Sequence, residues 1–63
     1  MSAREGYRRD VLEVVRAHRL PVNMDTVMQH YYPRERPMVE RALGDLVESG
    51  DLALAGGMYR RAA

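Results

Sequence analysis

A single amphipathic segment, residues 36–49, constrains the fold of this chain more than any other feature. At about 100° per residue of α-helix, five apolar side chains fall within a stripe roughly 140° wide: Val39, Ala42, Leu43, Leu46 and Val47. A helix with such a stripe has to bury that face. Gly50 follows directly and suits the left-handed conformation that ends many helices. The sequence therefore predicts a helix over about residues 36–49 that forms the centre of the core.

A first helix is predicted over residues 6–18, after a frayed segment at residues 1–5. Helical spacing places apolar side chains on one face, with Leu12 at its flank: Tyr7, Val11, Val14 and Val15. His18 falls at the edge of this stripe in the last turn, where the helix dipole favours an imidazole. The charged residues of the segment cover the opposite face, so the helix is expected to pack on one side only.

Residues 20–22 are predicted to be a short extended segment, since Pro21 cannot continue a helix and restricts the residue before it. This segment can pair as an edge strand. Asn23 has the chemistry of a helix N-cap and opens a second helix that runs to about residue 32. Pro33 ends this helix, whose expected buried positions are Val27, Met28 and Tyr31.

The C-terminal residues predict a small hairpin, over about residues 51–61. Gly56 and Gly57 suit the positive φ angles of a two-residue turn. The resulting register pairs Leu54 with Tyr59 and Leu52 with Arg61. The strand alternation then sends Leu52, Leu54 and Tyr59 to the core and Ala53, Ala55, Met58 and Arg60 outward. The expected architecture is mainly α with a small β-hairpin (α+β), in the order helix, strand, helix, helix, hairpin.

Length and composition bound the class of protein. A chain of 63 residues is a single domain, residues 1–63, near the lower size limit for a stable core. It has no Cys, and therefore no disulfide framework or thiolate metal site. No apolar run is long enough for a membrane span or a signal peptide, so a cytoplasmic protein is the default expectation. The net charge of +1 argues only weakly for a nucleic-acid partner, so the local arrangement of charges has to carry that case.

The residues do not assemble a predicted catalytic or metal site. Acid–base or nucleophilic catalysis requires titratable groups that converge in a concave site, and this chain is short for one. Asp10 and Glu13 lie on the solvent face of the first helix, away from His18. His18 and His30 are too few for a closed zinc site without carboxylate ligands, and His30 is expected to point to solvent. We therefore expect no enzyme, no cofactor and no metal.

The order of elements, with the pattern A-L-x-x-L-x-x-x-G-x-L over residues 42–52 followed by Gly56-Gly57 and Tyr59, resembles the winged helix-turn-helix family of small DNA-binding regulators. The resemblance covers about residues 7–61 and rests mainly on core and turn positions. In that family the third helix enters the DNA major groove and the hairpin, or wing, contacts the backbone or minor groove. The resemblance implies that residues 36–49 form the recognition helix. The chain departs from the family in its charged, proline-rich connection at residues 32–36 and in its uncharged wing tip.

Double-stranded DNA is the leading predicted partner, and transcription regulation the leading function. The resemblance places Arg34, Arg36, Met38 and Arg41 on the groove-facing side of the third helix. Arginine can contact phosphates or guanine, and a methionine can contact a thymine methyl group. Arg60 and Arg61 close the hairpin and can anchor flanking phosphates, as can Arg8 and Arg9 of the first helix and the preceding Arg4. The alternative for each arginine is a solvated charge, for instance Arg41 balanced by Asp45.

The rival hypothesis is a protein-interaction module that uses the same helix face without DNA. Asp45 and Glu48 on that face would repel phosphates. Gly44 also lies there, although an exposed mid-helix glycine costs roughly 1 kcal/mol relative to alanine. Either a phosphate backbone, a partner helix or a second subunit packs closely there, or the loss is simply tolerated. A homodimer fits both hypotheses, with Tyr7, Val14 or Tyr32 as candidate contacts.

Overall fold

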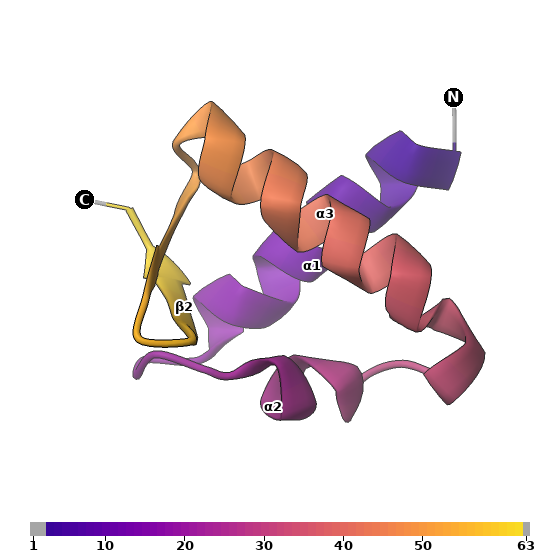
Figure 1. The fold of residues 1–63 in the computed structure, drawn as a ribbon, viewed down its shortest axis with the longest axis horizontal. Coiled ribbons are helices and arrows are strands. Elements are labelled where there is room, and N and C mark those ends of the chain that lie inside the picture. Colours follow the sequence, from indigo (N-terminus) through magenta and orange to yellow (C-terminus); the bar gives the residue numbers. More distant parts are fainter. Residues whose placement is uncertain (1–2, 63) are drawn as a thin grey trace.

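The computed structural model describes residues 3–62 and the side chains of residues 6–62. It contains three α-helices, a 3-10 turn and a two-stranded hairpin, which are α1 (Ala3–Ala17), α2 (Met24–Met28), η1 (Pro33–Glu35), α3 (Arg36–Ser49), β1 (Leu52–Ala55) and β2 (Met58–Arg61). The chain is therefore mainly helical with a small antiparallel hairpin, as the sequence predicts. Figure 1 shows α3 crossing over α1, with α2 below both helices and the hairpin at the left.

The core lies where α1, α2, α3 and the base of the hairpin meet. Its nine buried side chains are all apolar: Val11, Val15, Val22, Val27, Val39, Ala42, Leu43, Leu46 and Leu52. Four of the five residues of the predicted α3 stripe belong to this set, and the fifth, Val47, is partly buried against it. The bounds of α3 and the left-handed Gly50 after it, with φ of 89°, are also as predicted. The periodicity of residues 36–49 therefore specified the central element correctly.

The predicted bounds of α1 and α2 need correction. The predicted frayed segment is wrong for Ala3–Glu5, which are helical because they are favourable helix formers; residues 1–2 lie outside the described residues. The α2 helix keeps its predicted N-cap, since the Asn23 side chain accepts a hydrogen bond from the Thr26 amide at 2.8 Å. It ends at Met28, however, four residues before the predicted end. Tyr32 is extended, with φ of −77° and ψ of 148°, as a residue before proline should be.

The hairpin has the predicted register, with Leu52 opposite Arg61 and Leu54 opposite Tyr59. Gly56 and Gly57 both have positive φ angles, 57° and 76°, so the two-residue turn forms as expected. The predicted burial of Leu54 is wrong, because this side chain is 49% exposed. Leu52 is buried, and Tyr59, opposite Leu54, packs against the core, so the core covers this face of the hairpin only in part. Ala53, predicted to face outward, is half-buried.

Val22 joins the hairpin through a single backbone pairing with Tyr59. The Val22 amide donates to the Tyr59 carbonyl at 2.9 Å, and the Tyr59 amide donates to the Val22 carbonyl at 2.7 Å. The extended segment before α2 therefore pairs with the edge of β2 that faces away from β1. This pairing ties the start of α2 to the hairpin, as the edge-strand prediction required. Among residues 3–62, no helix has the length and apolarity to cross a membrane.

Candidate nucleic-acid interface

Four of the predicted DNA-contacting residues gather at the start of α3. Arg34, Arg36, Met38 and Arg41 are all exposed there. The Arg34 guanidinium lies 5.3 Å from the centroid of the Tyr32 ring, a distance within the range of a cation–π contact. Arg36 contacts Glu40 one turn later, with 3.3 Å between its Nε and the Glu40 Oε1. Two of the three arginines are therefore held by local partners.

Arg41 and Met38 are the most available groups of this set. Among residues 6–62, Arg41 makes no side-chain hydrogen bond or ion pair. Met38 is 51% exposed, which is high for a large apolar side chain. A bare guanidinium and a flexible apolar side chain less than one helical turn apart can contact a guanine edge and a thymine methyl group. The N-terminal half of α3 therefore exposes one hydrogen-bond donor group and one apolar side chain of the kinds that contact base edges.

Arg60 and Arg61 lie elsewhere, with the C-terminal end of α1. They line an open cavity of about 250 Å³ together with His18 and Arg19. Figure 1 places β2 on the opposite side of the molecule from the start of α3. The six predicted contact residues therefore form two separate sets, one at the start of α3 and one at the hairpin.

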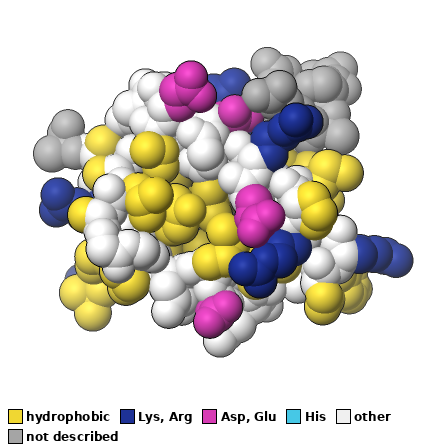
Figure 2. Space-filling model, viewed as in Figure 1, with side chains coloured by type: hydrophobic (Ala, Val, Ile, Leu, Met, Phe, Trp, Pro, Cys, Tyr) yellow, Lys and Arg dark blue, Asp and Glu magenta, His cyan; other side chains and the backbone are white. Residues whose placement is uncertain are grey.

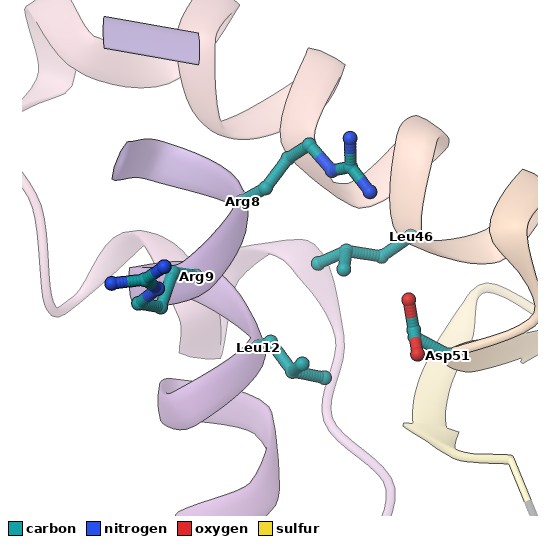
Figure 3. A pocket seen from close by; sticks show the side chains of 5 residues that line it. All are labelled: Arg8, Arg9, Leu12, Leu46 and Asp51. Carbon is teal, nitrogen blue, oxygen red and sulfur yellow. The ribbon is translucent and has the colours of Figure 1, made fainter. Parts of the chain in front are cut away.

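A second arginine-lined cavity lies between α1 and the C-terminal end of α3. Its volume is about 250 Å³, and Figure 3 shows Leu12 and Leu46 extending into the space between the two helices. Arg8 extends from α1 towards α3, whereas Arg9 turns away. Asp51 shares this cavity and accepts a hydrogen bond from the Ser49 hydroxyl at 2.7 Å. The carboxylate of Asp51 offsets part of the positive charge of the two arginines. The cavity therefore attracts an anion less strongly than two arginines would without the acid.

The outer face of α3 carries charges of both signs and is open at Gly44. Gly44 has no atom within 4 Å of the position a Cβ would occupy, among the atoms described beyond its own helix backbone and its chain neighbours. Packing inside the domain therefore does not require glycine at this position. Figure 2 shows that the basic side chains on this side of the molecule are separated by acidic and uncharged ones. Any DNA contact here depends on individual arginines rather than on a continuous basic surface.

Two tyrosine–carboxylate hydrogen bonds brace the connection before α3 against α1. The Tyr7 hydroxyl donates to Glu35 Oε1 at 2.8 Å, and the Tyr31 hydroxyl donates to Asp10 Oδ2 at 2.5 Å. Glu35 Oε2 also accepts the Tyr32 amide at 2.7 Å. The sequence placed Asp10 on the solvent face of the first helix, but it gave no sign of either tyrosine partner. This brace positions Arg34 and Arg36, which flank Glu35 in the chain.

These contacts shift the ionisation of the groups involved. The Tyr32 amide and the Tyr7 hydroxyl lower the pKa of Glu35, so its contribution to stability is present above pH 4.5 and is lost on acidification through the lowered value. Burial, followed by the hydrogen bond to Asp10, raises the pKa of Tyr31 well above 10. Because an unfolded tyrosine ionises near pH 10, the contribution of Tyr31 is complete below that pH and is lost as the pH rises towards its folded value.

We expect the urea concentration at the unfolding midpoint to decrease as the pH is raised from about 8 to about 11. The decrease should be smaller in the Tyr31→Phe variant. Phenylalanine cannot ionise, so it removes the cost of holding Tyr31 protonated. Tyr32→Phe is the matched control, because Tyr32 is 67% exposed, and this variant should keep the full pH dependence. If the unfolding midpoints of the wild type and of Tyr31→Phe changed equally with pH, the raised pKa of Tyr31 would not be the cause of the decrease.

The structure also brings together two histidines, His18 and His30, that are 12 residues apart in the sequence. His18 lies just after α1 and His30 just after α2, and their Nε2 atoms are 3.3 Å apart. The ring planes meet at 83° with centroids 5.5 Å apart. Within the described part of the chain, no group of three or more His, Cys, Asp or Glu side chains is placed to hold a metal ion. The pair was missed because its contact depends on how α1 docks against α2.

Comparisons of the chain with protein-family models, with curated proteins and with solved structures found no match.

Proposed function

We propose that this chain is a winged-helix DNA-binding protein, a small transcription regulator that reads DNA with the N-terminal half of α3. The observation that carries the proposal is the backbone pairing of Val22 with Tyr59. It gives a strand order of residue 22, β2, β1, with the two helices α2 and α3 inserted between the first and second strands of the chain. An extended segment, two helices and then a hairpin is the order of elements expected of a winged helix, and it supports the proposal.

The surface around the start of α3 supports the same function. The inner stripe of α3 is buried, so the helix is held rigidly, while Met38 and Arg41 project from the opposite side. Arg34 and Arg36 precede them and can contact phosphates on either side of a groove. Arg60 and Arg61 then supply phosphate contacts at the hairpin end, since a duplex extends well beyond one helix. In this proposal base contacts come from α3 and backbone contacts from the remaining arginines.

Titration of labelled duplex DNA at rising salt tests the proposal. With about four phosphate contacts, the logarithm of the affinity should fall with a slope of about −3.6 against the logarithm of salt concentration, which is roughly a 100-fold loss between 50 and 200 mM. Fluorescence anisotropy measures this directly. A flat salt dependence, or no binding at the lowest salt, would contradict DNA binding.

Exposed apolar side chains favour one alternative, a protein-interaction module. Tyr32, Met38, Leu54 and Met58 are 67%, 51%, 49% and 37% exposed. Figure 2 shows hydrophobic side chains gathered in the area bordered by α3, the hairpin and α2. A protein partner or a second copy of the chain would cover such a surface, whereas DNA would not. Failure to bind DNA at low salt would leave this alternative in place.

A further inference from the structure

We propose that His18 and His30 form a two-histidine site for a divalent transition-metal ion such as Zn²⁺. The ion would be bound by the two Nε2 atoms, and its remaining positions by water or a small anion. This site is separate from the proposed DNA-contacting residues of α3, and it does not depend on the DNA-binding proposal.

The separation of the two nitrogens matches what such an ion requires. Zinc–histidine bonds are about 2.0–2.1 Å long, and a tetrahedral angle between them places the two nitrogens about 3.3–3.4 Å apart. The observed distance between His18 Nε2 and His30 Nε2 is 3.3 Å. The ring planes meet at 83°, a T-shaped rather than a stacked contact, and the two Nε2 atoms are the pair in contact. To bind one ion, each ring has to direct its Nε2 lone pair to a common point beside the line that joins the two nitrogens.

The backbones on both sides of the pair are fixed by helix ends. The His18 amide donates to the Val15 carbonyl at 3.1 Å, and the His30 amide donates to the Val27 carbonyl at 3.0 Å. Val15 and Val27 are both buried in the core, with exposed fractions of 2% and 0%. Each ligand therefore stands close to an anchored residue. An ion held by both would link the C-terminal end of α1 to that of α2.

The surroundings leave room for the other ligands of the ion. His18 lines the open cavity of about 250 Å³ that also contains Arg19, Arg60 and Arg61, and His30 lines another of about 260 Å³. The three arginines oppose a bare cation, but they favour an anion in its open coordination positions. Chloride or phosphate bound to the metal would neutralise part of this charge. An exchangeable ion is therefore expected rather than a permanent structural one.

The composition of the chain makes the proposal simple to test. The sequence contains two histidines and no cysteine, so imidazole ligation can come only from this pair. A tag-free protein should be titrated with ZnCl₂ by calorimetry at neutral pH. We expect one ion per chain and a melting temperature that rises with zinc concentration, because an ion that binds the folded state stabilises it.

Substitutions of the two histidines should remove this response. His18→Gln and His30→Gln are each expected to weaken zinc binding by roughly tenfold or more, since even the loss of an outer contact to a ligand commonly costs 10–100-fold. Asp25→Asn is the matched control, because Asp25 is an exposed carboxylate in the first turn of α2, whereas His30 follows the end of that helix. The zinc affinity of this variant should equal that of the wild type. Circular dichroism without metal establishes that each variant is folded.

A measurement on the wild type alone keeps the test independent of the variants. In ¹H–¹⁵N spectra of the imidazoles, zinc should shift the Nε2 resonances of His18 and His30 together. Three results would overturn the proposal: no saturable binding, binding that persists in both histidine variants, or a shift confined to one ring. The last two would mean that the 3.3 Å contact is only an N–H···N hydrogen bond between the rings.

Discussion

Replacing Leu43 by alanine should lower the free energy of unfolding by about 2–5 kcal/mol. The Leu43 side chain is 0% exposed, at the centre of the buried stripe of α3. The substitution removes its apolar area from the core and leaves a cavity that the surrounding side chains cannot fully close. Because native domains are stabilised by only about 0.05–0.15 kcal/mol per residue, a loss of this size unfolds a large fraction of a 63-residue protein. Urea unfolding followed by circular dichroism measures it.

Leu54→Ala provides the matched control, since it deletes the same atoms from a side chain that is 49% exposed. Its expected cost is about 1 kcal/mol or less, because about half of the residue is already exposed to solvent. The contrast between the two leucines is the sharpest test of where the core ends. If the two variants lost equal stability, the hairpin would have to pack more deeply than the structure indicates.

The same two leucines show how far sequence periodicity can predict a fold. Leu43 belongs to a stripe that repeats along one helix from Val39 to Val47, so its inward direction is fixed by local geometry. Leu54 lies in a four-residue strand whose alternation is equally clear, and its partner Tyr59 is predicted correctly. Alternation fixes which face a side chain is on, but it does not fix whether another element covers that face. Which side chains of that face are covered depends on how the hairpin docks on the helices, and residues 52–59 alone do not encode this docking.

The side-chain contacts of the candidate sites were harder to predict, for a related reason. Tyr7 and Glu35 are 28 residues apart, Tyr31 and Asp10 are 21 apart, and each contact depends on the docking of separate elements. Helical spacing correctly placed Asp10 among exposed residues, yet it could not reveal that a tyrosine from another segment reaches it. The paired histidines were missed for the same reason, because each was assessed within its own helix.

Replacing Arg41 by alanine should weaken the binding of a preferred DNA sequence by roughly 5- to 150-fold, the loss associated with one good base contact. Arg41 is the exposed arginine of α3 with no partner among residues 6–62, so its removal breaks no ion pair within the described chain. Arg36→Ala would be a poorer test because it also releases Glu40 from its ion pair. Anisotropy titrations on a preferred and a scrambled duplex separate base recognition from general attraction.

Arg9→Ala is the matched control for Arg41→Ala, because it separates the loss of a positive charge from the loss of a base contact. It removes the same charge from α1, and Figure 3 shows the Arg9 side chain directed away from α3. If α3 reads bases, Arg41→Ala should reduce the preference for one sequence, whereas Arg9→Ala should at most weaken all sequences alike and lower the salt slope by about 1. Equal effects of the two variants on both duplexes would mean that charge alone attracts DNA. That result would remove α3 as the reading element while leaving the buried stripe, and the fold built on it, unchanged.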